Sequence, residues 1–243
     1  MALQEETLDI AHRYWAGRLG CSPADLRDGD DLLLVESDDG VDGIAIFDRE
    51  TTRVVSAGPD RIDDLRDRTD AIGDLEPTGE GEVAEALGIP IRSVLGPQFI
   101  GYVDDATFRP AHDANARVLD ADDRDAFDAL KRACPREEWE AQAGDLAFET
   151  HLRLAGRFLG DELAAVAGYR EIADGLVTAD VITHPDHRNR GFGTGAASAA
   201  IIEALAAGYA VDCRPVESWE TAVDIAEFLG FERYARAWRV LPM

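Results

Sequence analysis

The chain has 243 residues, 46% of them hydrophobic, and a formal net charge of −25. This composition supports a real hydrophobic core in one large domain or two modest ones, so disorder is excluded as the default. Duplex nucleic acid is excluded as an expected partner because no basic face can neutralise its phosphates, and no apolar run approaches the roughly 20 residues that a membrane span needs.

The acidic residues are dispersed along the whole chain, and Lys131 is the only lysine. A dispersed acidic surface with arginine in place of lysine is typical of adaptation to high salt, where charge repulsion is screened. The composition therefore predicts a halophilic source. The alternative, attraction of a cationic substrate, would concentrate the acidic residues around one cleft.

Three widely spaced cysteines, Cys21, Cys134 and Cys213, form no Cys-x-x-Cys pair. Neither a disulfide framework nor a zinc site is indicated, and no metal is expected. Cys134 and Cys213 fall on apolar positions, which predicts buried thiols. Residues 1–6 lack the basic start and apolar run of a signal peptide, so a cytoplasmic location is expected.

The sequence of the first half of the chain predicts a smaller α+β domain over residues 1–110. Apolar residues at helical spacing predict a helix over 4–19, which Gly20 ends. No motif in this half indicates a function. The further elements expected are a short helix from Ser22-Pro23, strands at 32–35, 43–47 and 53–56, helices at 60–71 and 82–87, and a strand within 94–103.

A linker is expected at 110–115, and beyond it the pattern is β-α-β-β-β-α-β-α-β over residues 116–243. Asp122 is expected to cap the first helix of this half, and Pro135 to end it. The other elements expected are strands at 117–119, 150–159, 162–172, 176–184 and 209–213, helices at 136–143, 192–207 and 220–229, and closing strands at 231–234 and 237–241.

The segment 180–195 joins a strand to a helix through a basic, glycine-rich turn. A turn of this kind places free backbone N–H groups at a helix N-terminus, which is a ready anion site. Gly191 and Gly193 let a ligand approach the backbone closely. Arg188 and Arg190 add positive charge beside those amides. For the Gly-x-Gly pattern alone, an ordinary turn with two solvated arginines would be the simpler interpretation.

The spacing Arg188-x-x-Gly191-x-Gly193, directly after Thr183-His184-Pro185, resembles the acetyl-CoA pyrophosphate loop of the GNAT superfamily of N-acetyltransferases. The order of elements over 116–243 and the block Ala222-x-x-x-Ala226-x-x-Leu229-Gly230-Phe231 are also similar to that family. The resemblance implies an α/β (α+β) fold, in which a GNAT-type mixed, mostly antiparallel sheet is flanked by helices and preceded by the smaller α+β domain.

The same resemblance implies an acetyltransferase that uses acetyl-CoA as cosubstrate and transfers the acetyl group directly, in a ternary complex, to a small-molecule or peptide amine. Family members often pair as homodimers. Main-chain contacts with acetyl-CoA would come from Ile182, Thr183 and His184. The contacts with the pyrophosphate would come from Arg188, Asn189, Arg190, Gly191, Phe192, Gly193 and Thr194.

The catalytic groups of the family are harder to find. The tyrosine that many members carry in the last helix is replaced by Ala226, and the histidine or carboxylate of the strand before the loop by Val177 or Ala179. The candidates left for proton transfer are Glu217, near the expected amine entry, and Tyr234, on a late strand. A solvated loop acid and a core aromatic residue are the alternative interpretations of this pair.

Two other functions compete with acetyl transfer. A non-catalytic CoA-binding or regulatory module would keep the loop and lack the catalytic groups. A dinucleotide-binding oxidoreductase would need the spacing Gly-x-Gly-x-x-Gly after the first strand of its domain, and the segment Gly191-Phe192-Gly193-Thr194-Gly195 has a different spacing and follows several strands. The module is therefore the alternative that we retain.

Overall fold

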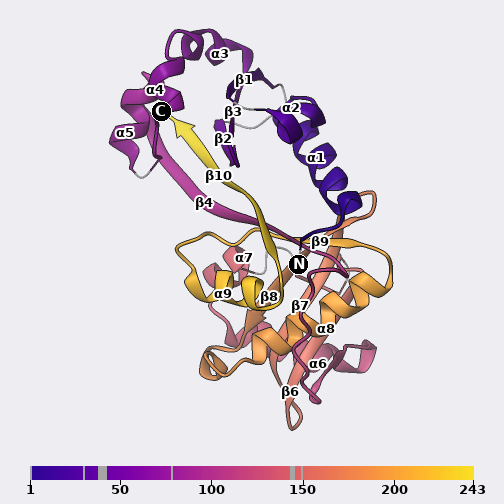
Figure 1. Cartoon of the computed structure of the whole chain (residues 1–243). Coiled ribbons are helices and arrows are strands. Elements are labelled where there is room, and N and C mark those ends of the chain that lie inside the picture. Colours follow the sequence, from indigo (N-terminus) through magenta and orange to yellow (C-terminus); the bar gives the residue numbers. More distant parts are fainter. Residues whose placement is uncertain (1, 30, 38–42, 78, 143–145, 149) are drawn as a thin grey trace. The chain divides into compact units, whose positions relative to one another are not determined.

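The structure is a computed structural model, shown in Figure 1, that describes residues 2–29, 31–37, 43–77, 79–142, 146–148 and 150–243. The chain forms two compact units, and neither is one continuous stretch of sequence. The N-terminal unit contains Glu5–Ile100, Val216–Trp219 and Arg233–Met243. The C-terminal unit contains Met1–Gln4, Gly101–Pro215 and Glu220–Glu232. No helix of the described ranges is long and apolar enough to cross a membrane.

The N-terminal unit packs short helices against strands in the order β1-β3-β2-β10-β4. Its core gathers aliphatic residues of β2 and β3, of the helices between β3 and β4, and of β10. The helices are α1 (Glu5–Leu19), α2 (Pro23–Asp28), α3 (Pro59–Arg66), α4 (Thr69–Gly73) and α5 (Glu80–Leu87). The strands are β1 (Leu32–Glu36), β2 (Ile44–Arg49), β3 (Thr52–Ala57), β4 (Ile91–Val103) and β10 (Glu232–Pro242).

Most elements of this unit form where the sequence predicts them, and two do not. The helix expected at 60–71 is divided into α3 and α4 by a turn in which the Arg68 N–H donates to the Leu65 carbonyl. The two closing strands expected at 231–234 and 237–241 are a single strand, β10. Arg236 lies opposite Asp48 of β2, so the ladder continues through the position where a break was expected.

Strands β4 and β10 each pass from one unit to the other. The end of β4, Gly101–Val103, pairs antiparallel with β9 in the C-terminal unit, whereas β10 pairs with β2 in the N-terminal unit. The units therefore differ from two continuous domains at 1–110 and 116–243. Residues 101–110 belong to the C-terminal unit, and Val216–Trp219 and Arg233–Met243 belong to the N-terminal unit.

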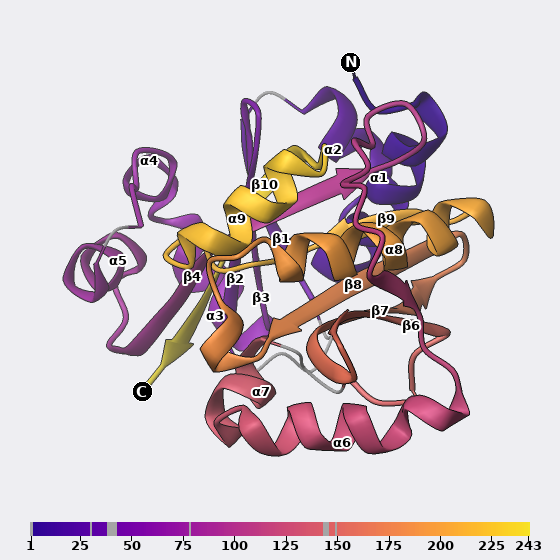
Figure 2. The same cartoon turned by 90° about the horizontal axis from the view of Figure 1, so that it is seen from below.

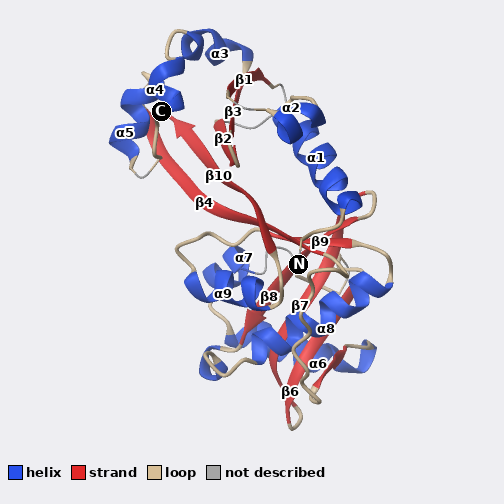
Figure 3. Cartoon of the chain, viewed as in Figure 1, coloured by secondary structure: helices blue, strands red, loops and turns tan. Residues whose placement is uncertain are grey.

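The C-terminal unit has the strand order β5-β6-β7-β8-β9 followed by the end of β4. All of its pairs are antiparallel except β8 with β9, which is parallel. Figure 3 distinguishes these strands from the helices around them. The elements are β5 (Ala116–Val118), η1 (Ala121–Asp123), α6 (Arg124–Ala133), α7 (Arg136–Gln142), β6 (Arg153–Leu159), β7 (Glu162–Ala173), β8 (Leu176–Thr183), η2 (Pro185–His187), α8 (Phe192–Ala206), β9 (Ala210–Cys213) and α9 (Glu220–Phe228).

Helices cover both faces of strands β6 to β8, with α8 on one side and α6 and α7 on the other (Figure 2). The buried face of α8 is rich in alanine, which allows close approach to the sheet. On the other side, Phe127 and Leu130 of α6 and Trp139 of α7 pack with Val166 and Ile182 of the sheet. Cys134 and Cys213 are buried, as predicted.

The start of α6 differs from the prediction that Asp122 caps it. A 3₁₀ turn precedes the helix, and Asp120 caps that turn by accepting the Asp122 N–H at 2.9 Å. The Asp123 carboxylate in return accepts the Asp120 N–H at 2.9 Å, which completes a capping box. The short turn moves the capping residue two positions towards the N-terminus.

Candidate functional site

The segment 180–195 forms the expected strand, turn and helix. Strand β8 ends at Thr183, the 3₁₀ turn η2 follows, and α8 begins at Phe192. Asn189 and Gly191 have left-handed backbones, with φ of 59° and 77°. Gly191 is the N-cap of α8 and provides no side-chain cap, so the first N–H groups of the helix have no partner within it. These amides and the helix dipole favour an anion at this point.

Two glycines of α8 allow close packing at its start. A Cβ at Gly193 would lie 2.7 Å from Thr183 Oγ1, and a Cβ at Gly195 would lie 3.0 Å from Asp113 Oδ2. At 2.7 Å something must shift, so glycine at 193 lets the first turn of α8 lie against the end of β8, and glycine at 195 leaves room for the Asp113 side chain. By contrast, Gly191 faces open space, because no atom lies within 4 Å of its Cβ position.

Arginines surround the beginning of α8. Arg188 forms an ion pair with Glu138 of α7, and its Nε lies 3.5 Å from the Thr183 carbonyl. The Arg190 guanidinium lies 4.8 Å from the ring centre of Phe192. Arg157 of β6, which the sequence did not single out, lies 3.9 Å from the same ring. Arginines therefore lie on more than one side of the site, and Arg188 and Arg157 are each paired with a carboxylate.

An acidic partner holds Arg157 in place. Asp113 lies in the segment before β5, and its carboxylate accepts a hydrogen bond from Arg157 Nε at 3.0 Å and another from the Asn115 N–H at 2.9 Å. Burial raises the pKa of the Asp113 carboxyl, but these two donors outweigh it and lower the pKa below its usual value. The charge on Asp113 thus fixes the direction of the Arg157 guanidinium towards α8.

Strand β8 has an open edge beyond its third residue. It pairs with β9 only from Leu176 to Thr178, and in the described part of the chain no strand pairs with this edge from Ala179 to Thr183. The His184 N–H donates to the carbonyl of Ala164 in β7. Because N–H groups alternate in direction along a strand, Ala179, Val181 and Thr183 direct theirs to the open edge.

This alternation refines the predicted main-chain contacts. Of Ile182, Thr183 and His184, only Thr183 directs its backbone N–H to the open edge, and the N–H of His184 is already bonded within the sheet. Val181 was not among the predicted contacts and has the required direction. The register of β7 with β8 supplied this information, and sequence spacing alone could not.

The two side chains predicted for proton transfer belong to the N-terminal unit. The Glu217 carboxylate is paired with Arg233 and, at 3.0 Å, with Arg236. Tyr234 is buried, with its ring 5.6 Å from the His12 ring and the Arg49 guanidinium 5.0 Å from its centre. Burial raises the pKa of the Tyr234 hydroxyl, which makes it a weaker acid. Their catalytic role stays a prediction.

Glu162, His184 and His187 have ligand atoms within 4.8 Å of one another, as in a metal site. Their hydrogen bonds argue for a different role. His184 Nδ1 accepts the Asp186 N–H at 3.2 Å, and His187 Nδ1 lies 3.3 Å from the Arg190 guanidinium, which can only donate. Each ring therefore carries its proton on Nε2, the atom that faces Glu162. A protonated Nε2 cannot bind a metal, so these residues fit a structural hydrogen-bonded cluster better.

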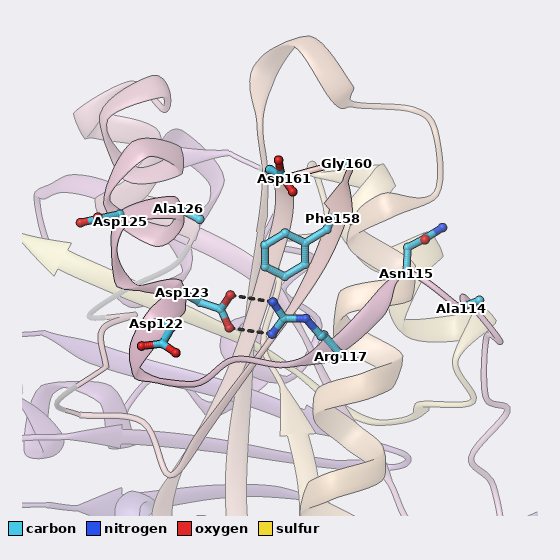
Figure 4. Close-up of a pocket in the computed structure, with 10 residues that line it drawn as sticks. All are labelled: Ala114, Asn115, Arg117, Asp122, Asp123, Asp125, Ala126, Phe158, Gly160 and Asp161. Atoms are coloured by element: carbon cyan, nitrogen blue, oxygen red, sulfur yellow. Dashed lines mark hydrogen bonds and ion pairs between the residues drawn. The ribbon is translucent and has the colours of Figure 1, made fainter.

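A separate cavity of about 680 Å³ lies beside η1 and the β6–β7 turn (Figure 4). In it, Arg117 donates to both oxygens of Asp123 at 2.6 Å, and its guanidinium lies 4.3 Å from the Phe158 ring centre. Hydrogen bonds from Arg117 are the main reason that the pKa of Asp123 is lowered. The paired charges leave no free cation here for an anionic ligand, so the cavity fits a structural ion pair.

Replacing Asp123 with asparagine is expected to lower the free energy of unfolding at neutral pH by about 1–2 kcal/mol, because it removes charged hydrogen bonds to a half-exposed arginine and weakens the capping box. The pKa of Asp123 is lowered by folding, so this stability is present above the unfolded pKa and lost as the pH falls through the folded pKa. Urea titrations at several pH values measure it. Asp161→Asn, at an exposed hairpin position, is the control, and a difference that persists in strong acid would contradict the assignment.

Comparison with known proteins identifies the C-terminal unit. Residues 117–231 match the model of the acetyltransferase (GNAT) family. They include every element from β5 to α9 except the first residue of β5, and so the whole segment 180–195. This part of the chain is a GNAT acetyltransferase domain. The chain matches no curated protein.

One solved structure resembles the fold of the whole chain, and two others match part of it. An acetyltransferase of the GNAT family from Colwellia psychrerythraea is 10% identical with a TM-score of 0.54, over 100% of this chain and 98% of that one. A GNAT-family structure from Novosphingobium aromaticivorans is 24% identical (TM-score 0.49), over 62% of this chain and 65% of that one. A GCN5-related N-acetyltransferase from Kribbella flavida is 20% identical (TM-score 0.49), over 68% and 64%. This chain thus covers less than two thirds of the latter two chains. The predicted mixed, mostly antiparallel sheet with flanking helices is confirmed.

Proposed function

We propose that the C-terminal unit is an N-acetyltransferase that transfers the acetyl group of acetyl-CoA to a small-molecule or peptide amine by direct attack in a ternary complex. One arrangement carries the proposal. The uncapped N-terminus of α8, with its arginines, lies at the end of β8, next to the open edge of that strand. The unpaired strand edge is followed directly along the chain by the anion site. This arrangement suits a ligand with a pyrophosphate and an extended amide-containing arm.

In this proposal the pyrophosphate binds to the N–H groups of Phe192, Gly193 and Thr194. Arg188 would exchange its Glu138 partner for phosphate oxygens, a stronger acceptor with more charge. The pantetheine arm pairs with the open edge of β8 as an added strand would, through the N–H groups that Val181 and Thr183 direct towards it. One of these N–H groups polarises the thioester carbonyl, which stabilises the oxyanion that forms during attack.

The acceptor amine must be unprotonated to attack. Loss of its proton requires a group beside the thioester, and Glu217 and Tyr234 remain the candidates from sequence. Their contacts within the N-terminal unit give them no special support, since Glu217 is neutralised by two arginines and Tyr234 is buried among aromatic rings.

A non-catalytic CoA-binding module is the second candidate function. The observation that favours it is that Val177 and Ala226, which replace catalytic side chains found in relatives, are both buried and apolar. A module of this kind would bind acetyl-CoA through the same loop and would transfer nothing. Binding and turnover must therefore be measured separately.

Calorimetric titration of the full chain with acetyl-CoA tests both candidates, in about 1 M KCl because the dispersed acidic surface predicts a requirement for salt. Release of CoA is then measured with spermidine, tyramine and a trialanine peptide as acceptors. Binding followed by release that depends on the amine supports the enzyme. Binding without release from any acceptor supports the module. Absence of binding contradicts both.

A further inference from the structure

Three buried polar atoms meet around Asp180 of β8. Asp180 Oδ2 lies 3.5 Å from His151 Nε2 and 3.8 Å from Arg170 Nε. All three atoms are buried and, among the described residues, form no hydrogen bond. Buried polar atoms nearly always have a partner, so three orphaned atoms in one place indicate that a proton, a water or a ligand group completes the cluster.

The sheet is built to accommodate this cluster. Gly168 of β7 lies directly opposite Asp180 in the β7–β8 register. A Cβ at Gly168 would lie 2.8 Å from His151 Cδ2 and 2.4 Å from a methyl carbon of Leu154. The missing side chain therefore leaves the space in which the imidazole of His151 lies over the strand and reaches the carboxylate.

Hydrogen bonds hold the imidazole of His151 in place. Its Nδ1 lies 3.3 Å from the Ala147 N–H nitrogen and 3.2 Å from the Ala147 carbonyl oxygen, with the Thr150 hydroxyl at 3.1 Å. When Nδ1 accepts the Ala147 N–H, the proton of the neutral ring is on Nε2 and faces the Asp180 carboxylate. The ring can therefore direct the carboxylate from a fixed position.

Other charges face the cluster from the neighbouring strands. Arg170 of β7 is described above, and on β9 the carboxylate of Asp212 is fully buried and accepts two hydrogen bonds from Arg214, at 2.8 and 2.6 Å. Burial is the main reason that the pKa of Asp212 is raised, and the negative charge of Asp180 adds to the effect. The two acids, on adjacent strands and on one face of the sheet, favour a cationic ligand group beside them.

Asp180 also lies where the open edge of β8 begins. Thr178 is the last residue of β8 paired with β9, where it lies opposite Asp212. Asp180 is the next residue whose side chain lies on the same face of β8 as that of Thr178. Its neighbour Val181 directs an N–H to the open edge. The side chain of Asp180 is 19% exposed, whereas that of His151 is fully buried. A ligand can therefore touch the carboxylate and not the imidazole.

We propose that Asp180 binds the acceptor as an ammonium and takes its proton, and that His151 is the positioning residue whose imidazole directs this carboxylate. The inference rests on the proposed function, since it names the base of that same reaction. Neither residue was among the sequence candidates.

The proton and bond changes balance as follows. One N–H bond of the ammonium breaks and its proton passes to the Asp180 carboxylate, which is partly exposed and later releases it to solvent. The neutral amine attacks the thioester carbonyl carbon, forming the C–N bond. The C–S bond then breaks, and the sulfur of CoA leaves with the bonding electrons. The second proton lost from the nitrogen goes to this thiolate, so the products are the amide, CoA and one proton.

The kinetic test compares Asp180→Asn with Asp180→Glu, His151→Gln, Glu217→Gln and, as the matched control on the same hairpin, the exposed Asp174→Asn. Release of CoA is measured with the fastest of spermidine, tyramine and trialanine between pH 5 and 9. Asp180→Asn is expected to lower kcat by about 100-fold or more while acetyl-CoA affinity stays within about twofold. Asp180→Glu should recover part of the rate, and His151→Gln should lower kcat while leaving the KM for acetyl-CoA unchanged.

A second readout needs no acceptor. The imidazole proton signals of His151 are followed by NMR, and Asp180→Asn is expected to shift the Nε2–H signal while Asp174→Asn leaves it unchanged. Circular dichroism confirms that the variants are folded. An unshifted Nε2–H signal of His151, an unchanged kcat in folded Asp180→Asn, or a loss of rate confined to Glu217→Gln would overturn the inference. Wild-type protein that neither binds acetyl-CoA nor releases CoA would instead contradict the proposed function.

Discussion

Gly191→Trp is expected to raise the dissociation constant for acetyl-CoA by at least about 100-fold, which is about 2.7 kcal/mol. Gly191 is the left-handed N-cap of α8, and its Cβ position opens into empty space beside the free amides of the helix. An indole there would occupy the place of the pyrophosphate, and the loss of the left-handed turn would redirect those amides. Calorimetric titration with acetyl-CoA measures the effect.

The control for this variant is Gly208→Trp at the other end of α8. Gly208 has a similar φ of 85°, compared with 77° for Gly191, and also faces open space. It therefore suffers a similar backbone strain far along the helix from the proposed pyrophosphate site. Equal losses of affinity in the two variants would show that strain in α8 explains the effect, and the loop would lose its assigned role.

Phe127→Ala is expected to lower the free energy of unfolding by about 3–5 kcal/mol, because it opens a cavity in the core between the sheet and α6 and α7. The ring is 2% exposed and makes edge contacts with Trp139 and Phe148, at centroid distances of 5.7 and 5.0 Å. Urea unfolding measures the change.

Phe228→Ala is the matched control, because Phe228 of α9 is the same residue type and is 61% exposed. Its removal is expected to cost less than about 0.5 kcal/mol. If the two variants unfolded at the same urea concentration, the packing of α6 against the sheet would be contradicted.

The turn between β8 and α8 could be predicted from the sequence because the backbone conformations and close contacts that it requires are local. Gly191 must adopt a left-handed backbone and Gly193 must admit Thr183, and both needs follow from a turn of fixed length between a strand and a helix. The arginines lie in the same short stretch. The strand β8 and helix α8 on either side have clear periodicity, so the context of the motif was predictable as well.

The cluster of Asp180 and His151 could not be predicted from the sequence in this way. Asp180 lies in the segment 180–195, which the sequence analysis singled out, but His151 lies in the segment before β6. Only the registers of β6, β7 and β8 bring the two side chains together across Gly168. A sequence pattern specifies the face of a strand and leaves the residue opposite unspecified. Likeness to relatives pointed to Val177 and Ala179, whose side chains lie on the opposite face of β8 from that of Asp180.

Pairing between distant strands was also outside what the sequence could predict. The helix 4–19 and the strands near 44–57 are local features and formed as expected. That Gly101–Val103 pairs with β9, and that β10 pairs with β2, depends on contacts between residues more than a hundred positions apart. Such pairings are set by the whole fold, and for this reason the compact units differ from continuous domains.

The most direct test of the account is a backbone amide NMR titration of the full chain with acetyl-CoA. The account predicts that the largest shifts occur at the N–H groups of Phe192, Gly193 and Thr194, for the pyrophosphate, and of Val181 and Thr183, for the pantetheine arm and the thioester. Ile182, whose N–H faces β7, should move less than its two neighbours. Shifts that leave the start of α8 unchanged, or that are largest at Ile182, would contradict it.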